Sequence, residues 1–335
     1  MTQMDGAGRT PDAVTEAVVR ADLDELLRMV DGLCAARDWE TLLTLRDRCR
    51  DALATGRQLW PVATHAEYRL ALEAPGPVAA AVLVEGTGRF ALGPLPEVAA
   101  STHAWAELAG HVTPGPVATV TVHERVVRGE DLSGFALPGP PVLELPRRLE
   151  PWEPAYAVAE YHADRAEFPA PPLPKLIEVA MPPPAPRADD ADALHALREL
   201  VAAWTRSSEG RADAVAVVGD ALGAIAALGP RRVRVAALEP GAALALMAWA
   251  AASGGAHGRR PGAAAGRFGA WWAAAALGGL LEEWPVDPDR LGAAVAGLDW
   301  YAWDAAEPPT GWRLHLAVED PRRGRAWAVA AVDAR

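Results

Sequence analysis

One segment of the sequence has the residue types expected of an anion-binding loop. It reads GGAHGRRPGAAAGR, and no acidic residue occurs between Glu239 and Glu282, so its arginines have no local counter-charge. Glycines allow close backbone approach, a helix starting near Gly262 offers free N–H groups, and arginine binds phosphate or carboxylate in bidentate fashion. The candidate ligand-binding residues are Gly254, Gly255, His257, Arg259, Arg260 and Arg267.

The same segment has a purely structural interpretation. Two adjacent glycines between helices are also typical of a tight αα-turn, and arginines often pair with acids supplied by other elements. Short Gly-rich motifs have low specificity, so both interpretations stay open. A cleft on which His257, Arg259 and Arg260 converge favours an anion site, whereas acids from another element that neutralise the arginines favour a turn.

The second half of the chain resembles a family of uncharacterised proteins. The resemblance rests on SGGAHGRRPGAAAGRFGAWW, then WPVDPDRL, and finally GWRLHLAVEDPRRGRAWAV. It is to a domain of unknown function from high-GC bacteria, and it therefore implies no activity, cofactor or site residue.

A second Gly-containing turn, AVAVVGDALG at 214–223, is followed by Glu239 and is similar to a dinucleotide-binding turn. The central glycine of that fingerprint is missing, and Asp220 stands where a pyrophosphate needs free N–H groups. We therefore expect an ordinary helix or an ordinary strand-to-helix turn there.

Catalytic and metal-binding motifs are missing from the sequence. It contains no G-x-S-x-G, no H-E-x-x-H, no Walker loop and no Cys/His cluster, so we assign no catalytic residue, metal or cofactor. Alternation along 311–319 places Arg313, His315 and Glu319 on one face of a strand, where solvated side chains are the simplest interpretation. The opposite face carries apolar residues and is expected to be core.

Composition excludes some functions. The 335 residues carry a formal net charge of −12, which repels phosphate and makes nucleic-acid binding unfavourable. The apolar windows at 240–258 and 268–281 are interrupted or short and predict buried helices, not membrane spans. Cys34 and Cys49 are the only cysteines and are expected to be buried thiols of a cytoplasmic protein.

The pattern of apolar residues predicts an α+β protein with two domains. Spacing of three to four residues over 10–128, with caps at Thr10 and Asp38, predicts a helical domain over 1–137, similar to HEAT repeats or an irregular α-solenoid. The α+β domain then covers 138–335: a Pro-rich strap or edge strands over 138–190, followed by a core over 191–335. Its end is expected to be a three-strand antiparallel meander packed on apolar helices.

These features favour a non-enzymatic binding or scaffold protein with a protein partner, because helical arrays usually present a surface to another macromolecule. The alternative is a protein that binds a small anion, or an enzyme acting on one, through the 254–267 loop.

Overall fold

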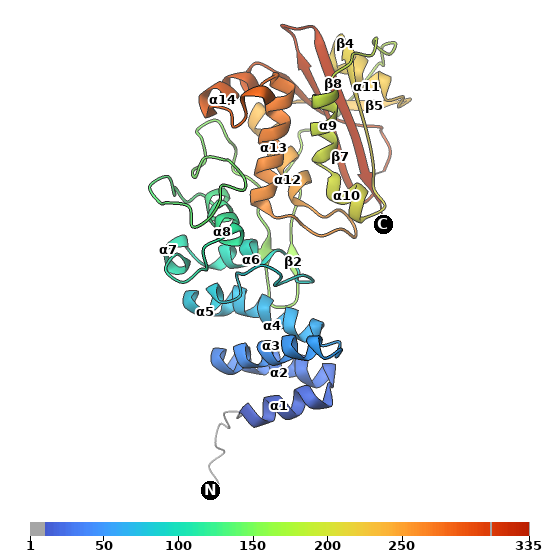
Figure 1. The fold of residues 1–335 in the computed structure, drawn as a ribbon. Helices are drawn as coiled ribbons and strands as arrows, with labels where there is room; N and C mark the ends of the chain where they lie inside the picture. Colours follow the sequence, from blue (N-terminus) through green and yellow to red (C-terminus); the bar gives the residue numbers. More distant parts are fainter. Residues whose placement is uncertain (1–10, 309, 335) are drawn as a thin grey trace. The chain divides into compact units, whose positions relative to one another are not determined.

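The computed structural model describes residues 11–308 and 310–334, and it separates into two compact units. Of the described residues, the first unit contains 11–125, 137–140 and 160–167. The second contains 126–136, 141–159, 168–308 and 310–334. Helices predominate in the first unit and an antiparallel sheet forms the second, as the α+β prediction requires (Figure 1).

Helices are the main elements of the first unit. They are α1 (Pro11–Arg20), α2 (Leu23–Ala36), α3 (Trp39–Ala54), α4 (Trp60–Glu73), α5 (Gly76–Ala80), α6 (Leu95–Thr102), α7 (Trp105–Leu108) and α8 (Pro116–Val127). The last two residues of α8 belong to the second unit. Two short strands, β1 (Glu160–Tyr161) and β2 (Ala166–Glu167), pair in antiparallel fashion. Contacts of α1 with α3, of α2 with α4, and of α4 with α6 build the unit in the manner of a helical array.

Local capping chemistry explains where the first helices begin. Asp38 accepts a hydrogen bond from the Thr41 N–H at the start of α3, as predicted. Apolar residues keep helical spacing from Val14 to Leu33, yet they form two helices, because Ala21 has a φ of 56° and Asp22 caps a new helix, α2. The predicted cap at Thr10 lies outside the described residues. Both cysteines are free and buried, and burial raises the pKa of Cys34 to about 11 and of Cys49 to about 12.

The second unit is built around one six-stranded sheet in the order β3-β5-β6-β7-β8-β4, in which all neighbours are antiparallel. The strands are β3 (Ile177–Val179), β4 (Arg211–Val218), β5 (Val233–Leu238), β6 (Asp299–Asp304), β7 (Trp312–Asp320) and β8 (Arg325–Asp333). The other elements are α9 (Ala191–Glu199), α10 (Ala202–Ser207), α11 (Ala221–Ala227), α12 (Pro240–Ala252), α13 (Ala263–Gly278), η1 (Leu281–Glu283) and α14 (Pro288–Ala296). The predicted C-terminal meander, β6 to β8, is confirmed.

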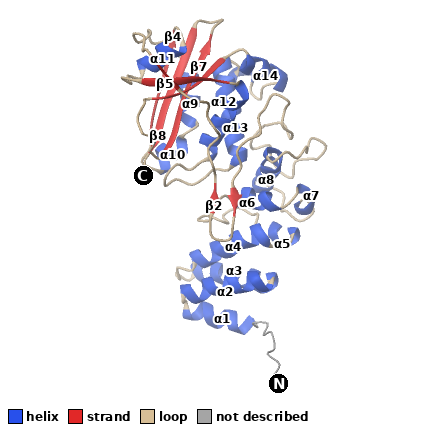
Figure 2. Ribbon diagram, turned by 180° about the vertical axis from the view of Figure 1, so that it is seen from behind, coloured by secondary structure: helices blue, strands red, loops and turns tan. Residues whose placement is uncertain are grey.

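Apolar helices cover one face of this sheet, as predicted. The helices α9, α12, α13 and α14 lie on one side of the sheet (Figure 2). The buried side chains Trp300, Leu316 and Trp327 share one core with these helices. Most residues of α12 and α13 are buried, which explains the apolar composition of these windows. Among the described helices, none is both long enough and apolar enough to span a bilayer.

The opposite face was expected to be solvated, and that prediction is wrong over part of its area. A second, smaller core forms there, in which Ile225 of α11 packs with Val217, Ala317 and Ala328. The reason is the strand-to-helix turn after β4: the Asp220 carboxylate accepts a hydrogen bond from Gly223 N and starts α11, which then lies on this face. No dinucleotide-type loop forms.

Most of the Pro-rich middle of the chain has no regular structure. The sequence has three short extended runs there, at 142–145, 155–161 and 176–179. The first forms no strand, the second forms one only at Glu160–Tyr161, and the third forms β3. β3 is an edge strand, where proline-rich flanks are tolerated because no further ladder must be satisfied.

Candidate functional site

The 254–267 segment forms the turn that connects α12 to α13, and its glycines are needed for close packing. A Cβ atom on Gly254 would lie 2.1 Å from the Gly258 carbonyl oxygen. Gly255 has a φ of +69°, and a Cβ atom there would lie 2.1 Å from an Asp333 Oδ2. These two positions therefore require glycine for reasons of space and backbone conformation.

A buried carboxylate from β8 holds this turn. The Ala256 N–H donates to Asp333 Oδ2 over 2.6 Å, and Asp333 has no solvent exposure. At the start of the turn, Trp204 Nε1 donates to Ser253 Oγ over 2.7 Å. One N–H group that an external anion would need is thus already bonded to a carboxylate of the protein itself.

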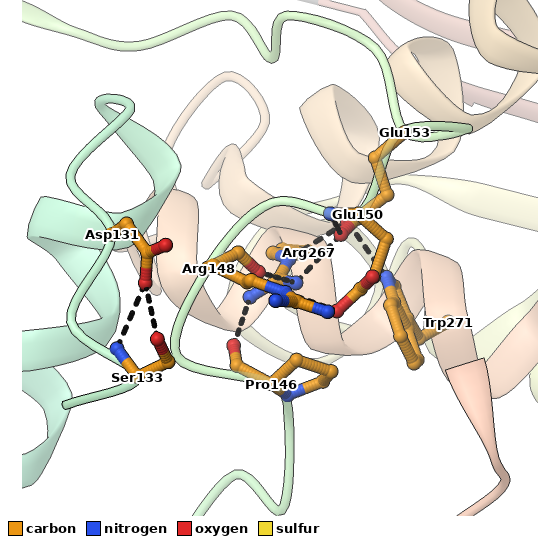
Figure 3. A network of polar contacts seen from close by, with 8 residues as sticks. All are labelled: Asp131, Ser133, Pro146, Arg148, Glu150, Glu153, Arg267 and Trp271. Atoms are coloured by element: carbon orange, nitrogen blue, oxygen red, sulfur yellow. Dashed lines mark hydrogen bonds and ion pairs between the residues drawn. The ribbon is translucent and has the colours of Figure 1, made fainter. Parts of the chain in front are cut away.

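Arg267 is fully buried in an internal ion pair with Glu153 (Figure 3). Its Nε and Nη2 atoms donate to the two Glu153 oxygens over 2.8 and 2.6 Å, and it also donates to the carbonyl oxygens of Pro146 and Arg148, each over 2.8 Å. Trp271 Nε1 donates to the same carboxylate. Arg267 therefore ties α13 to the 146–153 loop.

Burial raises the pKa of Glu153, but the hydrogen bonds and the charge of Arg267 outweigh burial, so the pKa is held below its usual value. The pair is consequently ionised at neutral pH.

The remaining predicted residues do not form one cluster with Arg267. His257 and Arg259 are exposed, whereas Arg260 is half-buried with its guanidinium carbon 3.7 Å from the centroid of the Phe168 ring. Phe168 in turn stacks on Trp249 of α12, with ring centroids 6.3 Å apart. Arg260 therefore contacts a stack of two aromatic rings, Phe168 and Trp249, and Trp249 also lines a cavity.

A cavity of about 210 Å³ lies where β6 and β7 diverge. Its polar and aromatic lining comes from Trp249, Trp303, Asp304, Arg313 and His315, and the remainder from Ala170, Pro171, Leu173, Leu176, Leu246 and Gly311. Pairing between β6 and β7 ends at Ala302 and Leu316, so Trp303 and His315 are the first residues beyond the ladder. Leaving the ladder opens the space between the strands.

Two contacts fix the polar residues of the cavity. The rings of Trp303 and His315 stack with centroids 4.4 Å apart and an interplanar angle of 14°. Arg234 of β5 donates to both oxygens of Asp304, over 2.9 and 2.6 Å, and the Ala306 N–H donates to the same carboxylate. Asp304 is therefore fully engaged by protein donors on one side.

The electrostatics of the cavity favour a negative ligand. Burial, reinforced by the charge of Arg313, lowers the pKa of His315 to about 4, so the imidazole is neutral at pH 7. Burial raises the pKa of Asp304, but the bonds and charge of Arg234 outweigh it, and the carboxylate stays ionised. Two arginines, one carboxylate and a neutral imidazole leave a local charge of +1.

Arg313 supplies the excess positive charge. Within residues 11–308 and 310–334 it has no carboxylate within 4.0 Å and no hydrogen-bond partner, although its charge acts on Asp304 and His315. The indole N–H groups of Trp249 and Trp303 are also buried without an acceptor in the described part of the chain. The cavity therefore lacks acceptors for three of its donor side chains.

Two residues of this cavity share a pattern that is visible in the sequence. Alternation placed Arg313 and His315 on one face of β7, but Glu319, the third member of that trio, caps α11 by accepting from Ala221 N over 3.0 Å. Trp249 and Trp303 carried no usable signal, since tryptophans are common in cores. No group of three or more potential metal-ligating side chains occurs among the residues that the structure covers.

Comparison with known proteins gives one match. The model of DUF6183, a family of unknown function, matches residues 24–335. The chain belongs to this family. The DUF6183 match covers nearly the whole chain, more than the C-terminal half on which the resemblance was expected, and includes every cavity residue. No curated protein and no solved structure matches the chain.

Proposed function

We propose that this DUF6183 protein binds a small organic anion in the cavity between β6 and β7, with Arg313 receiving the anionic group. The observation that carries the proposal is an arginine that lines a cavity and has no acidic partner within 4.0 Å in the described chain. A half-buried guanidinium gains most from a carboxylate or phosphate, which satisfies several of its donors at once.

The size and lining of the cavity favour a flat ligand with one ring. An apolar cavity of ~150 Å³ accommodates benzene, so about 210 Å³ accommodates a ring with a carboxylate attached. The apolar wall consists of Leu246, Ala170, Pro171, Leu173 and Leu176, and the stacked Trp303–His315 pair supplies a flat wall. A ligand oxygen is one acceptor that could satisfy an indole N–H, whose burial without a partner costs about 1–3 kcal/mol.

The polar side chains of the cavity are better suited to binding a ligand than to catalysing a reaction. A general base works best with a pKa near the operating pH, whereas the pKa of His315 is about 4 and its ring is held against Trp303. Asp304 is held by Arg234. We therefore infer a binding protein, with the anion placed in the sheet cavity instead of the 254–267 turn.

Calorimetric titration of the full chain with benzoate, acetate and inorganic phosphate tests this proposal. We expect benzoate to bind the wild type and Arg313→Gln to weaken that binding by about tenfold or more, because a hydrogen bond to a charged group contributes ~1.5–3 kcal/mol. Arg290→Gln is the control, since it removes an exposed arginine already paired with Glu283, and neither residue lines the cavity. Equal affinities of the two variants, or no binding of any of the three anions to the wild type, would contradict the proposal.

One observation in the helical unit favours a second candidate function, binding of a protein partner. Trp60, Phe90 and Leu92 are 39, 52 and 44% exposed and line a cleft of about 270 Å³. Large apolar side chains that gather on a surface often mark an interaction site. Co-purification from native lysate with the wild type, lost with Trp60→Ser/Phe90→Ser, supports this function; identical recoveries count against it.

A further inference from the structure

One wall of the cavity is a segment that makes no backbone hydrogen bonds to other described residues. Residues 168–176, FPAPPLPKL, are here called the strap, and Ala170, Pro171, Leu173 and Leu176 of the strap line the cavity. Four of its nine residues are prolines, which have no N–H to donate. No backbone–backbone hydrogen bond joins the strap to any other described residue. Side-chain contacts and its two ends must therefore hold it in place.

The C-terminal end of the strap continues into β3. This strand pairs with β5 over Ile177–Val179, and Glu178 receives two hydrogen bonds from Arg232 of the adjacent loop, over 3.0 and 2.9 Å. That end is therefore fixed to the edge of the sheet.

The N-terminal end of the strap follows β2 directly, and within the strap this end is held by the aromatic ring of Phe168. The Phe168 ring stacks on the Trp249 ring, with centroids 6.3 Å apart and planes at 21°. The Arg260 guanidinium carbon lies 3.7 Å from the centroid of the Phe168 ring. A guanidinium this close to a ring face is in cation–π range. Arg260 comes from the 254–267 turn, whose backbone Asp333 holds in place.

We propose that Arg260 and Phe168 form a latch that holds the strap closed over the ligand cavity, which gives the 254–267 turn a positioning role. This inference rests on the proposed function, because closing the cavity matters only if the cavity binds a ligand. Trp249 joins the two: it stacks on Phe168 and lines the cavity. An anion bound in the cavity therefore contacts the same strap and indole that the latch orders, so binding stabilises the closed strap.

A single lysine makes opening of the strap measurable. Lys175 is the only lysine in the sequence, it lies within the strap, and it is exposed. A lysine-specific endoprotease can thus cut this chain at one bond, Lys175–Leu176. A protease needs a locally extended segment, so cleavage reports the population of the open strap when opening is fast relative to cutting.

The experiment compares cleavage rates of the full chain without ligand. We expect Arg260→Met and Phe168→Ala to be cut between about two and thirty times faster than wild type, the range that a cation–π contact of ordinary strength gives. Arg260→Lys, which keeps the cation, should restore most of the protection. Arg259→Met is the matched control, since it removes the neighbouring, exposed arginine of the same turn and should be cut at the wild-type rate.

Two outcomes overturn the latch: equal cleavage of wild type and Arg260→Met, or equal acceleration in Arg259→Met. Circular dichroism at the cleavage temperature shows whether a variant has unfolded. If Arg260→Met has unfolded, the cleavage rate of Arg260→Lys is compared with that of wild type instead. A separate arm adds benzoate. Protection of wild type by benzoate supports both proposals, whereas no protection together with fast cleavage of Arg260→Met retains the latch and contradicts the benzoate site.

Discussion

Replacing Arg267 with methionine removes a buried charge and leaves its partner behind. Arg267 and Glu153 each have 0% side-chain exposure, and the Arg267 guanidinium donates four hydrogen bonds. Removing one member of a buried ion pair costs about 3–5 kcal/mol, since the other charge stays desolvated. We therefore expect Arg267→Met to lower the free energy of unfolding by that amount.

Urea unfolding followed by tryptophan fluorescence measures this loss, because Trp271 donates to the Glu153 carboxylate. The double variant Arg267→Met/Glu153→Leu should recover part of the stability, since it leaves no charge without a partner. Arg232→Met, which breaks an exposed pair with Glu178, is the matched control and should unfold almost like wild type. A loss under ~1 kcal/mol for Arg267→Met, accompanied by loss of anion binding, would show that Arg267 serves a ligand and refute the structural role.

Two further predictions concern pH and the 254–267 turn. Burial lowers the pKa of His315 from its ordinary value near 6.5 to about 4. As the pH drops from about 6.5 to 4, the unfolded chain therefore binds a proton at this residue before the folded chain does, and the free energy of unfolding falls. His315→Gln should remove that part of the pH dependence in urea titrations, whereas the exposed His257→Gln should keep it; equal slopes would contradict the assignment. Gly255→Ala should destabilise the protein by about 1–3 kcal/mol, because its Cβ would collide with Asp333 at a positive φ. Gly241→Ala, whose Cβ meets only an ordinary contact at 3.7 Å, should be close to neutral in thermal unfolding, and a similar loss in both would contradict the steric argument.

Much of the fold follows from signals that are local in sequence. Asp38 and Asp220 start helices because a carboxylate can accept from an N–H three residues ahead, and both bonds form. The meander follows from alternation along β7 and from the turn after Asp320. Such features need no knowledge of distant residues.

The candidate site could not be predicted in the same way, because its parts come from distant elements. The partner of Arg267 lies 114 residues earlier, so an acid-free window around Arg267 says nothing about its neutralisation. Arg313 and His315 were visible as one face of a strand, but their cavity also needs the end of the β6–β7 ladder, a tryptophan of α12 and the strap. The charge of Arg260 indicates an anion site in the sequence, whereas in the structure its guanidinium lies over the Phe168 ring.

The most direct test of the account compares two ligands of the same shape, one charged and one neutral. Calorimetric dissociation constants for benzoate and benzamide should differ by about tenfold or more in wild type, in favour of benzoate, because Arg313 has no carboxylate partner of its own in the described chain. In Arg313→Gln the two constants should become nearly equal. An undiminished preference for benzoate in that variant would contradict the assignment of Arg313 as the anion-binding residue.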